Sequence, residues 1–134
     1  MGEMQILTGG CACGALRYQV RAAVIDAGYC HCLLCQRTTG APVLAWASIP
    51  IEGVAYVAGT PSVYRSSAWG ERRFCGTCGA QIDYRDREAP TSVSINIATL
   101  DEPGAIPPAR HIFTAHRLPW FEVADDLPRH DAGA

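Results

Sequence analysis

Alternating apolar and polar residues dominate this chain and predict a mainly β fold. Ser92 to Ile97 alternates strictly, and Leu16 to Val20 shows the same period of two, which is typical of a strand with one buried face. Pro42 to Ile49 is more continuously apolar and predicts a more buried strand. Shorter strands are expected at Val54 to Val57, Val63 to Arg65, Arg72 to Cys75 and Ala80 to Tyr84.

One segment alone predicts an α-helix, the short stretch from Leu33 to Thr39. Asp101 to Arg110 is rich in proline and acidic residues, so we expect a loop there. Nine prolines and thirteen glycines are consistent with the many turns of a β domain. The 134 residues show no repeat or low-complexity segment, and we expect a single domain spanning residues 1–134.

The charge pattern argues against a nucleic acid or a membrane as partner. The net charge is −2, the chain has no lysine, and no basic cluster extends beyond Glu71-Arg72-Arg73. No apolar run approaches the roughly 20 residues of a membrane span. Met1 to Gln5 has no positive segment leading into an apolar one, as a secretory signal would. We therefore expect a cytoplasmic protein; the sequence does not indicate its oligomeric state.

Seven cysteines form three closely spaced groups: Cys11 and Cys13; Cys30, Cys32 and Cys35; Cys75 and Cys78. An odd number leaves one thiol over in any scheme of disulfides alone, and disulfides are rare in the cytosol. Thiolates this close in sequence suit zinc, which binds sulfur at about 2.3 Å in a tetrahedron. Inert buried cysteines, disulfides and a redox-active pair at Cys75 and Cys78 are the alternatives.

The seven thiols divide naturally into four and three. The two isolated pairs would form a closed four-thiolate site, and Cys30, Cys32 and Cys35 would form a local site with one open coordination position. Spacing alone also allows the group of three to recruit a residue from either pair. We expect two zinc ions per chain.

Several segments, taken in order, resemble one known family: Gly9 to Tyr18, Cys30 to Ala41, Arg73 to Gly79, Ile97 to Asp101, His111 to Phe113, Leu118 to Trp120 and Asp126 to Pro128. That family is the glutathione-dependent formaldehyde-activating enzyme family, also called the CENP-V/Gfa family. The resemblance implies an Mss4-like fold of several antiparallel sheets tied by zinc knuckles. It also implies a structural zinc held by Cys11, Cys13, Cys75 and Cys78, and a catalytic zinc held by Cys30, Cys32 and Cys35.

The ligand set of the open site favours a sulfur substrate. Three thiolates give the zinc site a formal charge of −1, so a bound water should ionise less readily than on zinc held by neutral histidines. A soft thiol suits the fourth position, because zinc holds it as a thiolate at neutral pH.

The family reaction implied by the resemblance is the addition of glutathione sulfur to formaldehyde, which gives S-hydroxymethylglutathione. The expected function is therefore a zinc-dependent carbon–sulfur lyase or synthase whose partner is a small thiol such as glutathione. Alternatives are a non-catalytic Mss4-like zinc module that binds a protein, or a labile-zinc sensor.

Other polar residues have more ordinary expected roles. His31 lies between two ligands, and its side chain should point away from theirs in an extended segment, so we expect packing beside them rather than coordination. His111 and His116 could line a pocket, but a surface or hydrogen-bonded structural role is favoured. Arg37 could meet a substrate carboxylate, although a solvated helix face is the simpler expectation. Core or pocket-wall positions are expected for Trp69 and Trp120.

Overall fold

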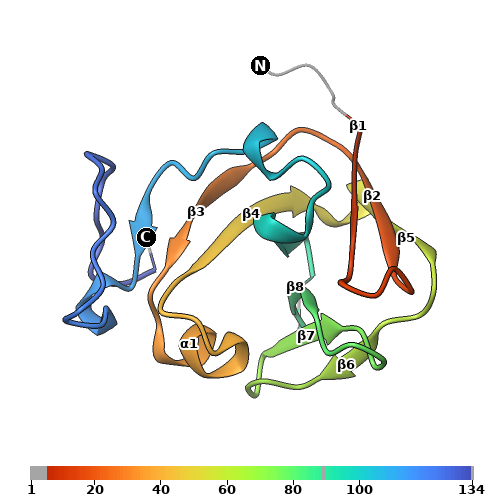
Figure 1. Cartoon of the computed structure of the whole chain (residues 1–134), viewed down its shortest axis with the longest axis horizontal. Helices are drawn as coiled ribbons and strands as arrows, with labels where there is room; N and C mark the ends of the chain where they lie inside the picture. Colours follow the sequence, from red (N-terminus) through yellow and green to blue (C-terminus); the bar gives the residue numbers. More distant parts are fainter. Residues whose placement is uncertain (1–5, 89, 134) are drawn as a thin grey trace.

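The computed structural model describes residues 6–88 and 90–133, whose strands form two sheets (Figure 1). A three-stranded antiparallel sheet has the order β1-β2-β5 and contains β1 (Ile6–Gly10), β2 (Arg17–Arg21) and β5 (Val54–Ala58). A seven-stranded sheet has the order β10-β3-β4-β9-β8-β7-β6. Its strands are β3 (Asp26–Cys30), β4 (Leu44–Pro50), β6 (Ser62–Tyr64), β7 (Gly70–Phe74), β8 (Gln81–Asp86), β9 (Ser92–Asn96) and β10 (His111–Ile112).

The prediction of a mainly β fold is confirmed. The alternation of apolar and polar residues arises, as expected, from strands with one buried face. In β9, Val93 and Ile95 are fully buried, whereas the serines between and before them are only half-buried. In β2, Tyr18 and Val20 are likewise fully buried. Ile95, Tyr18 and Val20 pack with Ile49, Ile82 and their neighbours into one hydrophobic core. Burial of one face of each strand therefore explains the period of two.

The helix α1 (Leu33–Thr39) has the predicted bounds. Cys32 caps its N-terminus, because the Cys32 Sγ accepts a hydrogen bond from the backbone N–H of Cys35 at 3.3 Å. Gly40 ends the helix in a left-handed conformation (φ 70°), which glycine adopts without steric cost. The remaining helical segments of the described residues are short 3-10 turns: η1 (Ile51–Gly53), η2 (Ile97–Thr99), η3 (Pro103–Ala105) and η4 (Thr114–His116). Among these helices, none has the length and apolar character needed to cross a bilayer.

The pattern of apolar and polar residues did not predict three of the strands, β1, β3 and β10. β3 reads Asp-Ala-Gly-Tyr-Cys, which neither alternates nor is rich in β-branched residues. It is a strand because β4 pairs with it in antiparallel fashion on one side and β10 pairs with it in parallel on the other. Tertiary pairing thus overrides weak local propensity. The expected loop at Asp101 to Arg110 contains the short turn η3 and no strand.

β3 runs so close to the segment that leads into β10 that a glycine is required at its centre. The backbone N–H of Tyr29 donates to the carbonyl of Arg110 at 2.8 Å. A Cβ atom on Gly28 would lie 2.7 Å from that same carbonyl oxygen and 3.0 Å from Cζ2 of Trp46. Both distances are shorter than normal carbon contacts, so an alanine there would push the two segments apart.

We therefore expect Gly28→Ala to lower the free energy of unfolding by about 1–3 kcal/mol, the usual cost of overpacking. Gly104→Ala is the matched control, since no heavy atom outside the adjoining residues lies within 4 Å of the Cβ it would add. That variant should stay within about 0.5 kcal/mol of the parent protein. Urea denaturation of the metal-loaded proteins measures both, and equal midpoints for the two variants would contradict the close approach.

Candidate metal centres and the adjoining pocket

Two hairpin turns bring four cysteines together. Cys11 and Cys13 lie in the turn between β1 and β2, and Cys75 and Cys78 lie in the turn between β7 and β8 (Figure 1). The four Sγ atoms all lie within 4.8 Å of one another. Cys13 is 3.7 Å from Cys11 and 3.8 Å from Cys75, sulfur to sulfur. The four-cysteine cluster therefore joins two segments that are far apart in the chain.

These separations suit a shared metal rather than a disulfide. A tetrahedron with metal–sulfur bonds of 2.3 Å places its sulfurs about 3.8 Å apart, whereas bonded sulfurs are about 2.05 Å apart. All seven cysteines are free thiols in this structure. A backbone N–H from Leu16 donates to the Cys11 Sγ at 3.2 Å and lowers the pKa of Cys11 to about 6. The cluster can hold a metal ion as thiolates.

The second group, the three-cysteine cluster, is local. Cys30 ends β3, Cys32 precedes α1 and Cys35 lies in its first turn. Their Sγ atoms lie within 4.8 Å of one another, with 3.4 Å between Cys30 and Cys35. Hydrogen bonds from Cys30 and Cys35 hold the pKa of Cys32 well below its usual range, so negative charge gathers on that sulfur. This cluster can also hold a metal ion.

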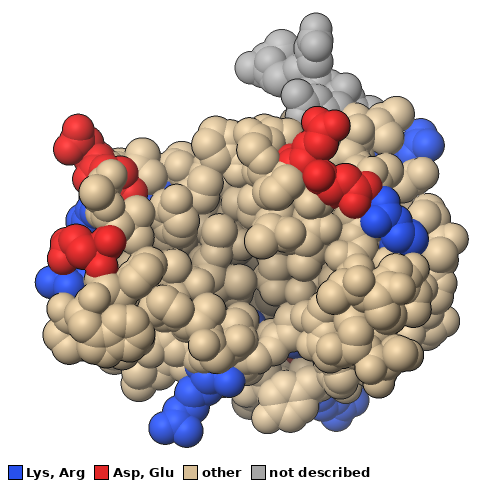
Figure 2. All heavy atoms as spheres, viewed as in Figure 1, with Lys and Arg blue, Asp and Glu red and all other residues tan. Residues whose placement is uncertain are grey.

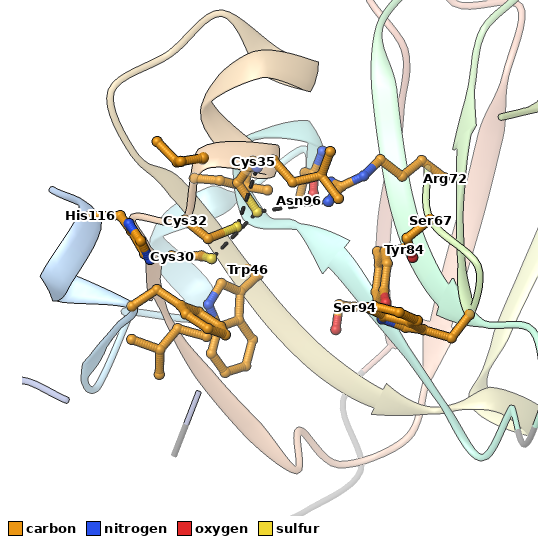
Figure 3. A pocket seen from close by; sticks show the side chains of 16 residues that line it. Cys30, Cys32, Cys35, Trp46, Ser67, Arg72, Tyr84, Ser94, Asn96 and His116 are labelled. Atoms are coloured by element: carbon orange, nitrogen blue, oxygen red, sulfur yellow. Dashed lines mark hydrogen bonds between the residues drawn. The ribbon is translucent and has the colours of Figure 1, made fainter. Parts of the chain in front are cut away.

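A cavity of about 450 Å³ opens beside the three-cysteine cluster (Figure 3). All three of its cysteines line the cavity, and none of the four-cysteine cluster does. The other lining residues are Leu33, Leu34, Leu44, Trp46, Ser67, Trp69, Arg72, Tyr84, Ser94, Asn96, Ile112, Phe113 and His116. Most are apolar or aromatic, and no acidic residue is among them. Charged side chains on the face shown in Figure 2 lie mainly at its periphery.

His31 points away from the two cysteines that flank it. Its Nε2 lies 2.8 Å from Nδ1 of His111, and Nε2 of His111 lies 3.0 Å from an oxygen of Asp125. Both histidines are buried, and burial lowers the pKa of His31. His31 therefore packs behind the cluster, as expected from the extended backbone, and His111 is a buried, hydrogen-bonded residue.

The structure also tests the roles expected for two other polar residues and two tryptophans. His116 is solvent-exposed, in keeping with the favoured surface role, and it also lines the pocket, which the sequence had left as the alternative. Arg37 is exposed on α1 and does not line the pocket, in keeping with a solvated helix face. Trp69 lines the pocket as expected, but the core or wall position expected for Trp120 is wrong. Trp120 is 72% exposed because it lies in a surface turn after the last 3-10 helix.

Arg72 is a charged pocket residue that the sequence did not suggest. It lies on β7 and is 6% exposed, and its Nη2 lies 3.9 Å from the Sγ of Cys35. Its guanidinium carbon lies 5.1 Å from the ring centre of Tyr84. The alternation of side chains along a strand could have identified it. Gly70 and Arg72 share the buried face of β7, so the charged side chain of Arg72 points inward.

Comparisons with known proteins agree with this architecture. Residues 6–116 match the family described as glutathione-dependent formaldehyde-activating enzyme. A protein from Halomonas elongata, whose name provisionally assigns it as such an enzyme, is 28% identical over 130 residues, covering 88% of this chain and 81% of that protein. A Rhodobacter sphaeroides protein of known crystal structure shares the fold, with a TM-score of 0.60 and 22% identity over 91% of this chain and 98% of that one.

The matched segment contains all three cysteine groups and all the residues that line the pocket. It spans far more than half of the 134 residues. This chain therefore belongs to the glutathione-dependent formaldehyde-activating enzyme family.

Proposed function

We propose that this protein is a zinc enzyme that forms or cleaves the carbon–sulfur bond of a thiol–carbonyl adduct. S-hydroxymethylglutathione, made from glutathione and formaldehyde, is the adduct that family membership favours. The observation that carries the proposal is a cluster of three free cysteines, Cys30, Cys32 and Cys35, in the wall of a pocket of about 450 Å³.

The two clusters differ in a way that fits two roles. Four sulfurs complete the coordination of a zinc ion, and the four-cysteine cluster lies outside the pocket, which suits a structural site. Three sulfurs leave one coordination position for a ligand, and the three-cysteine cluster borders the pocket, which suits a catalytic site. Thiolate ligands favour zinc over the harder divalent metals. Free thiols also fit a reducing compartment, so we place the protein in the cytoplasm.

The reaction needs no further reactant. A thiol sulfur bonds to the carbonyl carbon, the carbon–oxygen double bond becomes single, and the thiol proton ends on the oxygen. Zinc at Cys30, Cys32 and Cys35 would supply a position that holds the thiol sulfur as a thiolate. Apolar walls such as Trp46 and Phe113 exclude water from the pocket, and this protects a carbonyl group from competing hydration.

A non-catalytic zinc module that binds a protein partner is the second candidate. Such a module needs only the four-cysteine cluster to hold its hairpins together. The three-cysteine cluster and its pocket would then have no purpose, and this favours the enzyme. A labile-zinc sensor would use the three-cysteine cluster but would not need the pocket.

Purified protein should contain two zinc ions per chain by elemental analysis, and it should accelerate exchange between glutathione, formaldehyde and their adduct in exchange NMR. A competing chelator should remove the zinc of the three-cysteine cluster first, because one of its positions is open to solvent and ligands. Activity should disappear with that first equivalent and return when zinc is added. Full activity with one zinc per chain, or two zinc ions without thiol binding, would rule out the proposed function.

A further inference from the structure

Arg72 carries a charge that is buried without a carboxylate partner among the described residues 6–88 and 90–133. It is 6% exposed, and its Nε is buried with no hydrogen-bond partner. The adjacent Arg73, on the other face of β7, is paired: it lies 2.7 Å from Glu71 and 3.9 Å from Asp83. A buried charge is costly unless an opposite charge compensates it. Some other negative charge must therefore face Arg72 in the functional protein.

Arg72 lies against a sulfur of the three-cysteine cluster. Its Nη2 lies 3.9 Å from the Sγ of Cys35, and the ring of Tyr84 supports the guanidinium at 5.1 Å. Figure 3 shows Arg72 extending from β7 across the pocket toward the cysteines, which lie at the opposite wall near α1. The charge of Arg72 can thus interact electrostatically with both the cluster and a ligand in the pocket.

The charge of the cluster depends on what fills its fourth position. Zinc with three thiolates has a formal charge of −1; a neutral ligand leaves it at −1, whereas a thiolate brings it to −2. In a pocket walled mostly by apolar side chains, that second negative charge is poorly solvated unless a cation lies beside it. Arg72 is the one arginine among the lining residues, and the chain has no lysine.

We propose that Arg72 is a positioning residue that makes the three-cysteine site select an anionic sulfur over a neutral ligand. Its buried charge offsets the negative charge that arrives with a thiolate and has little effect on a neutral ligand. The inference rests on the proposed function and deepens it, since it names the feature that admits a thiolate substrate.

Ligand binding to the cobalt-substituted protein tests this without relying on turnover. Cobalt(II) in a thiolate site has visible bands that shift when the fourth ligand changes. Two probes are titrated at one pH: 2-mercaptoethanol, which binds as a thiolate and carries no other charge, and imidazole, which binds as a neutral ligand. For Arg72→Gln we expect thiol affinity to fall about 10–100-fold, the usual effect of losing a charge-assisted contact, and imidazole affinity to change less than about 3-fold.

Three further variants separate charge from structure. Arg72→Lys keeps the charge and should retain most of the thiol affinity. Arg72→Met removes the charge without leaving a buried polar group, so it serves if the glutamine variant fails to fold, and it should show the same selective loss. Arg37→Gln removes an exposed charge two residues from Cys35 and should bind both probes as the parent does, because solvent screens that position.

Each result has a definite meaning. Equal losses for thiol and imidazole would indicate a structural role and overturn the inference, as would unchanged thiol affinity in the folded Arg72→Gln or Arg72→Met variant. If the parent protein binds imidazole but no thiol, the proposed function itself fails. Selective loss of thiol binding, with two metal ions still bound, supports both.

Discussion

Replacing Cys78 with serine is expected to leave the protein unfolded or insoluble. The change removes one of four sulfurs from the cluster that joins the β1–β2 turn to the β7–β8 turn. Metal binding at such sites is worth about 10–16 kcal/mol in zinc-finger peptides. The net free energy of unfolding of a domain is only about 5–15 kcal/mol. Losing a large part of the metal-binding free energy would therefore leave the folded state less stable than the unfolded chain.

Cys78 is a sharper probe than Cys75. Cys75 is 2% exposed and belongs to the hydrophobic core, so its replacement would also disturb packing. Cys78 is exposed, and a serine there changes the metal ligand and little else. Thr77→Ser, in the same exposed turn, is the matched control and should behave as the parent does. Far-UV circular dichroism and zinc content measure the outcome; a folded Cys78→Ser protein with two zinc ions would refute a structural role for the cluster.

Replacing Cys32 with serine should abolish activity without unfolding the protein, in contrast to the change at Cys78. The rate should fall to that of the uncatalysed reaction. The three-cysteine cluster spans only residues 30–35, so its metal holds no distant segments together. Closing so short a segment restricts the unfolded chain far less than closing one between two remote hairpins. Stability should therefore change much less than in Cys78→Ser, although one of three ligands beside the pocket is lost.

The measurement pairs zinc content with exchange NMR and thermal unfolding. Cys32→Ser should bind one zinc per chain, retain a cooperative unfolding transition and show no acceleration of adduct exchange. A variant that keeps the parent rate would remove the three-cysteine cluster from the mechanism. A variant that unfolds would show that this cluster too is structural.

Local features of the sequence were sufficient to predict the elements with the clearest residue patterns. The alternation in Ser92 to Ile97 corresponds to β9, because one face of that strand is buried in the core. The helix α1 was predicted with its bounds, because Gly40 provides a left-handed stop directly after Thr39. β3 was missed because its five residues lack a period of two, and only the pairing of β4 and β10 with its two edges makes it a strand.

For the cysteines too, the local sequence predicted part of the arrangement, and contacts between distant segments decided the rest. Spacing alone determined that each group could present its sulfurs from a tight turn, because one or two intervening residues leave the chain little freedom. It left open which groups share an ion. The tertiary structure brings Cys11 and Cys13 to Cys75 and Cys78 and keeps Cys30, Cys32 and Cys35 apart from them.

The sequence by itself thus determined a mainly β chain with three thiol groups suited to metal, since these properties depend on neighbours within a few residues. Only the tertiary structure decided which thiols meet, and only it placed Arg72 of β7 against Cys35 of α1 in one pocket. These contacts join residues that are distant in the chain, and they depend on the order in which the strands pair, which no local pattern of residues encodes.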